Sequence, residues 1–209
     1  MTGPEQQTSL DLVDPRLIAP KLRRVALVAA AVGVGCALVL GLLVSWSVGL
    51  IVGLVVGGPT AASALLALRR RTWLAGTTIR SQRAIGQRSV DAARAISAEL
   101  QVRTGRVSQV GVRIQEGDSA LRVPLALYTD TGGAELSVLG LRRLADALSA
   151  GELAAAAAVS SVLVEQLRAE ARDAGLEERP LYAAVRLVRD SGRAPFTTLS
   201  DAEVASLLD

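Results

Sequence analysis

The sequence has no histidine, a single cysteine and few aromatic residues. Without histidine there can be no Ser-His-Asp triad, no histidine metal ligand and no histidine general base. The one cysteine, Cys36, cannot form an intramolecular disulfide or a cysteine zinc cluster, and it reads as a small buried hydrophobic residue. An aromatic content of 2% suits membrane helices better than a large enzyme core. We therefore predict no catalytic residue, no metal and no cofactor.

Lysine is also nearly absent, because Lys21 is the only one and arginine supplies the remaining positive charge. This bias is typical of high-GC bacterial genomes. The charge is unevenly distributed: residues 69–113 hold ten arginines against two acids, whereas residues 114–209 hold nine arginines against fifteen acids. Such an asymmetry predicts surfaces with different partners. Since no aromatic residues interleave with the arginines, we expect no nucleic-acid partner.

Charge is missing entirely from residues 25–68. A single helix of this length would measure roughly 66 Å, about twice the thickness of the hydrocarbon core of a bilayer. Two spans fit, Val25–Ser45 and Ser47–Leu68, which together form a transmembrane helical hairpin. Trp46 lies between them, and tryptophan favours the membrane–water interface. Trp46 is thus predicted to anchor the outer tip, and Trp73, which follows the second span, is predicted to be a further interface anchor.

Basic residues flank this apolar stretch on both sides and predict its orientation. Lys21, Arg23 and Arg24 precede it, and Arg69, Arg70 and Arg71 follow it. By the positive-inside rule both clusters lie in the cytoplasm. The expected location is the bacterial plasma membrane, with two spans, a cytoplasmic segment 1–24 and both termini cytoplasmic.

Small residues recur every four positions in each predicted span. The first span carries Gly33 and Gly41, and the second carries Gly49, Gly53 and Gly57. This spacing lines one face of a helix with little side-chain bulk, which lets helices pack closely in lipid. We predict helix–helix packing through these glycines, within the hairpin, between copies of the chain or with a partner helix.

The segment 69–150 is predicted to be a cytoplasmic domain rich in β-strands. Residues 72–82 read as one strand, residues 84–94 as a turn with a short strand, and residues 95–133 as alternating strands separated by the turn at 116–119. This gives four or five strands. Pro124 places its strand at an edge or at a bulge. Gly132–Gly133 is predicted to be a turn into the following helix, and Glu135 to be a turn-type acid.

The remaining chain is predicted to be helical. Leu141, Leu144 and Leu148 share one face of a helix over 137–150, and a C-terminal helical segment follows over 151–209. Pro180 marks a helix start. Ser200 with Glu203 three residues later forms a capping box for a short final helix. The fold class is therefore α+β: a two-helix transmembrane hairpin, a small antiparallel β domain and C-terminal helices.

Several motifs resemble bacterial membrane-anchored domains of the pleckstrin-homology-like (PH-like) type. They are the basic exit from the hairpin, "RTWLAGTTI" (71–79), "ALRVPLAL" (120–127) and "LGLRRLADAL" (139–148), with Trp73, Leu74, Gly76 and Thr77 as the most specific positions. The resemblance covers roughly residues 69–150. It implies a barrel-like sheet that follows the membrane segment and is closed by a C-terminal helix. Such a barrel has seven strands, more than the alternation predicts here.

The arginines nearest the hairpin are the main functional signal. They are Arg69, Arg70, Arg71, Arg80, Arg83 and Arg88. Positive charge at the inner leaflet is attracted to anionic lipid by about 1 kcal/mol per residue. The alternative is that these arginines only set the orientation of the helices in the membrane and occupy solvent-exposed faces of the strands.

Three hypotheses on function follow from these observations. The first is a non-enzymatic membrane protein whose PH-like domain is a membrane-proximal adaptor or scaffold, bound to the lipid bilayer, to anionic lipid and to a protein partner or a second copy. The second is an accessory subunit of a larger membrane transport, secretion or cell-envelope complex, suggested by the glycine faces. An enzyme acting on a lipid-linked substrate is the least supported, since nothing supplies its chemistry.

Overall fold

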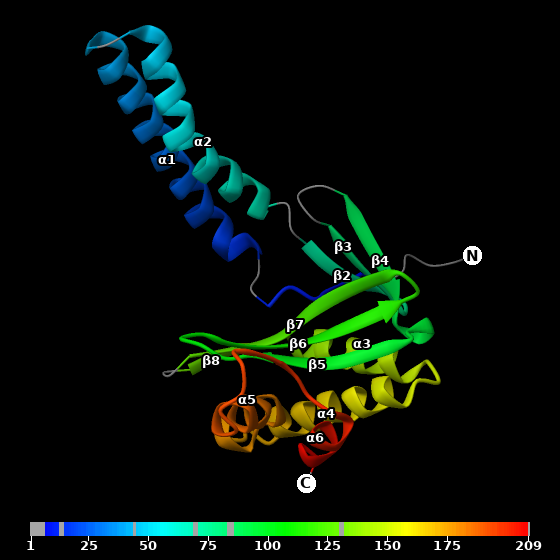
Figure 1. Cartoon of the computed structure of the whole chain (residues 1–209). Coiled ribbons are helices and arrows are strands. Elements are labelled where there is room, and N and C mark those ends of the chain that lie inside the picture. The colour runs from blue at the N-terminus through cyan, green and yellow to red at the C-terminus, as the bar shows by residue number, and fades with distance from the viewer. Residues whose placement is uncertain are drawn as a thin grey trace. The chain divides into compact units, whose positions relative to one another are not determined.

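The computed structural model describes residues 7–12, 15–43, 45–68, 71–82, 86–129 and 132–208. The chain divides into two compact units (Figure 1). The smaller unit contains the helices between residues 15 and 68. The larger contains residues 7–12, 71–81 and 87–208, which form the sheets and the other helices.

The smaller unit is a pair of helices, α1 (Pro15–Leu43) and α2 (Trp46–Leu68), which lie side by side (Figure 1). Helix α1 begins ten residues earlier than the predicted span, since Pro15 is favourable in a first turn. Within the described chain, Arg23–Leu43 is the one stretch found long and apolar enough to cross a membrane, and Trp46–Thr60 is apolar but shorter.

The connection between the two helices differs from the predicted tip. Trp46 is the first residue of α2, and its side chain is largely exposed. The residue before it, Ser45, caps the helix: its carbonyl accepts the N–H of Gly49 at 3.1 Å, and its hydroxyl accepts the N–H of Val48 at 3.4 Å. A serine at this position satisfies N–H groups that lack helical partners. The turn therefore precedes the tryptophan.

The larger unit contains two antiparallel sheets. The four-stranded sheet has the order β1-β2-β3-β4, and the five-stranded sheet has the order β8-β7-β6-β5-β9. Their strands are β1 (Thr8–Ser9), β2 (Arg71–Ala75), β3 (Thr78–Gln82), β4 (Gln87–Asp91), β5 (Ser97–Arg103), β6 (Ser108–Glu116), β7 (Ser119–Thr129), β8 (Gly132–Glu135) and β9 (Phe196–Thr198). The predicted β-then-α order is thus present, but with seven strands between residues 71 and 135.

Two local features account for the missed strands. Residues 72–82 form a hairpin rather than one strand, because Gly76 adopts a φ of +60° that a tight turn requires. Gly132–Gly133 is not a turn but the beginning of β8, which pairs with β7 in the register Tyr128↔Gly133. Glycine is rare in strands, so composition alone misplaced this segment.

Pro124 lies at a β-bulge, one of its two predicted environments. The pairs Val110↔Ala126 and Gly111↔Pro124 leave Leu125 as an extra residue in β7. Because β7 lies between β6 and β8, it is not an edge strand. The bulge lets a residue without an N–H occupy an interior strand.

The helices of the larger unit follow the sequence pattern closely. They are α3 (Val138–Ser149), α4 (Ala154–Ala171), α5 (Pro180–Asp190) and α6 (Asp201–Ser206), with short 3₁₀ turns η1 (Ala92–Arg94) and η2 (Leu176–Glu178). Leu141, Leu144 and Leu148 are buried in one core that contains residues of both sheets. The capping box of Ser200 and Glu203 is formed at α6. The α+β class is confirmed.

Strand β1 was not expected from the sequence. It pairs with β2 in the register Thr8↔Leu74 and Ser9↔Trp73. The pairing extends through Leu10, whose N–H donates to the carbonyl of Thr72 at 2.9 Å, and Leu10 is fully buried. A segment that precedes α1 therefore belongs to the same folded unit as the segment that follows α2.

Candidate functional site

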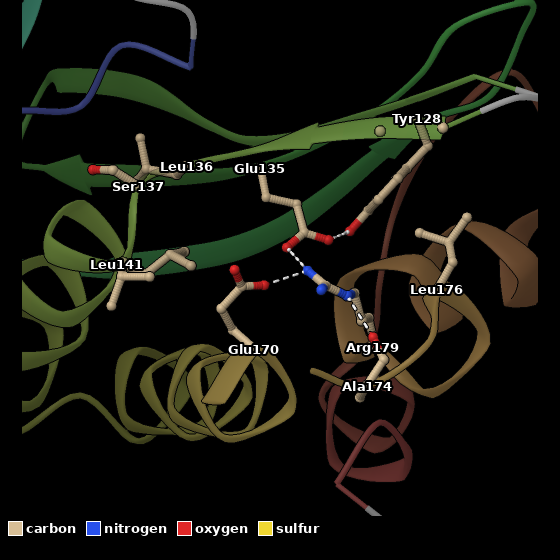
Figure 2. A pocket seen from close by; sticks show the side chains of 12 residues that line it. Tyr128, Glu135, Leu136, Ser137, Leu141, Glu170, Ala174, Leu176 and Arg179 are labelled. Carbon is tan, nitrogen blue, oxygen red and sulfur yellow. Dashed lines mark hydrogen bonds and ion pairs between the residues drawn. The ribbon is translucent and has the colours of Figure 1, made fainter. Parts of the chain in front are cut away.

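The larger unit contains a cleft of about 750 Å³ between β8 and the helices α4 and α5 (Figure 2). Its wall on the sheet side comes from β7, β8 and the start of α3, and its other wall comes from the end of α4, η2 and the start of α5. The lining residues are Tyr128, Gly132, Gly133, Glu135, Leu136, Ser137, Val138, Leu141, Glu170, Ala174, Leu176 and Arg179. The lining thus combines aliphatic side chains, exposed strand backbone and three charges.

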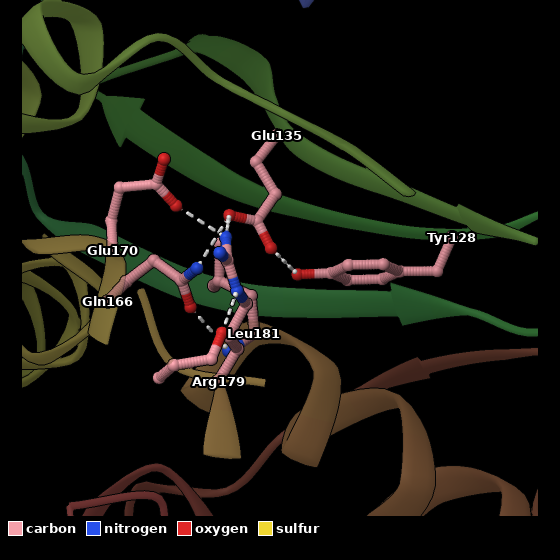
Figure 3. A network of polar contacts seen from close by, with 7 residues as sticks. Tyr128, Glu135, Gln166, Glu170, Arg179 and Leu181 are labelled. Atoms are coloured by element: carbon pink, nitrogen blue, oxygen red, sulfur yellow. Dashed lines mark hydrogen bonds and ion pairs between the residues drawn. The ribbon is translucent and has the colours of Figure 1, made fainter. Parts of the chain in front are cut away.

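Glu135 is the centre of a polar network in this cleft (Figure 3). The hydroxyl of Tyr128 donates to Glu135 Oε1 at 2.7 Å, and Arg179 Nη1 donates to Glu135 Oε2 at 2.7 Å. Arg179 also reaches Glu170 Oε2 at 2.5 Å. The side chains of Glu135 and Arg179 are only 14% and 18% exposed, so removing either partner would leave a largely buried charge without compensation.

Gln166 connects this network to the helical layer. Its side chain is fully buried; Nε2 donates to Glu135 Oε2 at 2.7 Å, and Oε1 accepts the N–H of Leu181 at 3.1 Å. The second contact caps the first turn of α5, whose N–H groups have no helical partner. One buried amide therefore fixes the position of α5 relative to α4 and β8.

The glycine at the beginning of β8 makes room for Tyr128. A Cβ atom added to Gly133 would lie 2.4 Å from Tyr128 Cδ1, so the ring crosses directly over this residue to reach Glu135. On its other side the ring packs edge-on against Tyr182, with centroids 5.3 Å apart. Gly133, which composition assigned to a turn, thus provides the space for the aromatic wall of the cleft.

The protonation states in the cleft favour binding over proton transfer. Burial, together with the hydrogen bond to Glu135, raises the pKa of the Tyr128 phenol. Burial alone would lower the pKa of Arg179, but its hydrogen bonds and charge interactions with Glu135 and Glu170 raise it above its ordinary value. Both groups keep their protons at neutral pH. No group of three or more metal-ligating side chains is found within the described chain.

The structure brings together only some of the predicted arginines. Arg71, Arg80 and Arg88 lie on β2, β3 and β4, all are exposed, and none has an ion-pair partner within the described ranges. Arg80 lies on the face opposite to buried Ile79, whereas Arg88 shares the side of buried Val90. Arg69, Arg70 and Arg83 lie outside the described residues.

The predicted glycines lie at the contact between α1 and α2. A Cβ on Gly33 would meet Gly53 O at 2.8 Å and Gly57 Cα at 3.1 Å, and a Cβ on Gly49 would meet Ala37 O at 2.3 Å. Gly41 instead lies under the ring of Trp46, whose Cε3 would be 2.8 Å from an added Cβ. The glycine faces of the two helices are therefore directed at each other.

Trp73, the other predicted anchor, lies in the middle of β2. It is half-buried, and its indole Nε1 is buried without a hydrogen-bond partner among the residues described. The position is in the strand that pairs with β1. Trp73 is thus part of the larger unit's sheet.

Sequence reasoning missed the cleft, although it named four of its residues, Gly132, Gly133, Glu135 and Leu141, for other roles. Glu135 is not a turn-type acid but a strand residue directed at α4 and α5. One signal was available: Tyr128 and Glu135 are large or charged residues within otherwise small and aliphatic segments. A comparison with protein-family models, curated proteins and solved structures finds no significant match.

Proposed function

We propose that the chain is a non-enzymatic adaptor of the bacterial plasma membrane, anchored by α1 and α2, with its larger unit in the cytoplasm. One observation carries this proposal: β1 precedes α1, β2 follows α2, and the two strands pair. Along the sequence, the helix pair therefore lies between two strands of one folded unit. The cleft, which holds the ion-paired side chains of Glu135, Glu170 and Arg179, is the partner-binding site of that unit.

The pairing of β1 with β2 supports two membrane crossings. A folded unit lies on one side of the bilayer, so the chain must return to that side between Ser9 and Arg71. If the apolar stretch Arg23–Leu43 crosses the membrane, then α2 crosses it in the opposite direction. Helix α2 has 23 residues and no charge, enough for about 30 Å of hydrocarbon. The basic flanks place both termini in the cytoplasm.

Cysteine accessibility tests this topology in the full chain. In a Cys36→Ser background, Ser47→Cys should react with a membrane-impermeant maleimide added to intact cells. Thr78→Cys, in β3, should react only after the cells are lysed. Labelling at both positions in intact cells would overturn the second crossing and the cytoplasmic location, and protection of both positions would overturn the first crossing.

The larger unit is proposed to be a PH-like domain. The support is its order along the chain: the strands β2 to β8, which make up most of both antiparallel sheets, follow the helix pair and are followed by α3, which packs into the common core. Helices α4 to α6 extend beyond this scheme, and the end of α4, η2 and Arg179 build one wall of the cleft. In this proposal the sheets are the scaffold, and the added helices make the binding site.

The arginines near the helices are proposed to hold the domain against anionic lipid. Arg71, Arg80 and Arg88 are exposed and lack acidic partners among the described residues, so their charge remains available. In nanodiscs containing 30% phosphatidylglycerol, amide exchange in β3 and β4 should be slower than in purely zwitterionic discs. Arg80→Gln with Arg88→Gln should remove about 2 kcal/mol of attraction and abolish this difference.

A matched control for the lipid experiment is Arg106→Gln with Arg142→Gln. It removes the same charge from exposed positions outside β2–β4 and should leave the lipid-dependent exchange unchanged. If the control has the same effect as the test pair, net charge rather than this surface is responsible. If neither variant changes exchange, the lipid-facing role is wrong.

The accessory-subunit alternative is less well supported. It was motivated by the glycine faces, and in α1 and α2 all five of those glycines, Gly33, Gly41, Gly49, Gly53 and Gly57, contact the opposite helix. This use within the chain removes the main reason to expect a further helix there. The adaptor remains the function that the geometry supports best.

A further inference from the structure

Strand β8 has a free edge at the mouth of the cleft. It is the terminal strand of its sheet, and within the described part of the chain no strand pairs with its other side. The N–H of Leu136 donates to Leu125 O at 2.8 Å, which fixes the alternation of the ladder. Residues 132 and 134 then direct their backbone groups at β7, and Gly133 and Glu135 direct theirs away from it. Those groups are available to a further strand.

The side chains at this edge favour a cationic ligand group. Glu135 and Glu170 supply two negative charges, and Arg179, which pairs with both, supplies one positive charge. Glu170 is 43% exposed, so one carboxylate of the cluster faces the opening. A basic side chain that enters the cleft would contact Glu170 and balance the remaining negative charge.

Apolar residues border the same opening. Val138, at the start of α3, lines the cleft and is 54% exposed, although α3 buries Leu141, Leu144 and Leu148. Leu136, Leu176 and Ala174 line the cleft itself. The opening thus offers a hydrogen-bonding edge, a carboxylate and an aliphatic border. Binding of this kind takes affinity from main-chain pairing and specificity from alternate side chains.

We propose that the cleft binds an extended segment of a partner protein that adds a strand to β8 and places one arginine or lysine beside Glu170. The aliphatic neighbours of that basic residue pack against Val138 and Leu176. This inference deepens the adaptor function and rests on it for the existence of a protein partner. It is independent of the topology, so the cysteine experiment can succeed while this proposal fails, and the reverse.

A displayed library of random nine-residue peptides tests the proposal with the full chain in nanodiscs. The enriched peptides should contain a basic residue with β-branched or aliphatic residues on either side. Their binding should slow amide exchange at Gly133 and Glu135. Glu170→Gln should weaken an enriched peptide about fivefold, the effect expected for one partly exposed ion pair. Glu178→Gln, an exposed acid outside the lining, should leave affinity unchanged.

Three outcomes would overturn the proposal. One is an enriched set without basic residues, or no enrichment at all. Another is equal weakening by Glu170→Gln and Glu178→Gln, which would indicate only a general attraction of positive charge. The third is a homodimer, detected as an oxidative crosslink of Ala134→Cys in the Cys36→Ser background, because a second copy would then occupy the β8 edge.

Discussion

Replacing Gly53 with leucine should separate α1 from α2. An added Cβ would already lie 2.5 Å from Gly33 O and 2.7 Å from Ala37 Cβ, and the leucine branch would need further space between two backbones. Overpacking typically costs about 1–3 kcal/mol, and backbone atoms cannot move aside as side chains do. We therefore expect a loss at the upper end of this range or above, enough to displace the helices.

Electron paramagnetic resonance can measure this separation. Nitroxides at Val28 and Val56, which are exposed and border one groove between the helices, should show strong dipolar broadening in the parent chain. Gly53→Leu should reduce it. The matched control is Gly35→Leu, because a Cβ at Gly35 has no neighbour within 4 Å. Unchanged broadening in Gly53→Leu, or equal loss in Gly35→Leu, would refute the packing role of the glycine.

Replacing Arg179 with leucine should destabilise the larger unit by about 3 kcal/mol, because it leaves Glu135 charged and mostly buried without its cationic partner. The ion pair is short, at 2.7 Å, and both side chains are under one-fifth exposed. Thermal unfolding of the full chain in mild detergent, followed by circular dichroism, measures the change. Amide exchange at the start of α5 should also accelerate.

Two further variants make this prediction specific. Arg186→Leu removes an arginine from α5, which begins directly after Arg179. Its ion pair with Glu177 is exposed, at 50% and 69% for the two side chains, so the loss should cost below about 1 kcal/mol. Glu135→Gln in the Arg179→Leu background removes the uncompensated charge and should restore at least half of the lost stability. If Arg179→Leu costs no more than Arg186→Leu, the network does not hold the cleft together.

The helices were the most predictable part of this fold. The leucine spacing of α3, Pro180 at the start of α5 and the capping box at α6 each act within a few residues, and sequence patterns record such local preferences directly. The break between α1 and α2 was predicted from length alone. The prediction placed this break at Trp46, because the tryptophan was assigned to the turn. In the structure Trp46 already belongs to α2, and Ser45 caps the helix before it.

The cleft could not be predicted because it depends on register between distant segments. Tyr128 reaches Glu135 only because β8 pairs with β7 at Tyr128↔Gly133, and Arg179 arrives from more than forty residues further along the chain. A glycine pair in a polar context favours a turn locally. A glycine is needed at position 133 of the strand because any side chain there would clash with the ring of Tyr128. This contact exists only in the folded protein, so the local sequence does not reveal it.

The pairing of β1 with β2 has a consequence for biosynthesis. The N-terminal strand leaves the ribosome before either helix, yet its neighbour in the sheet is made only after both. Closing so long a loop carries an entropic penalty, and the paired helices shorten it by returning the chain near its starting point. The assembly of α1 with α2 is therefore a step in completing the sheet. A variant that disrupts the helix pair should also delay or prevent the pairing of β1 with β2.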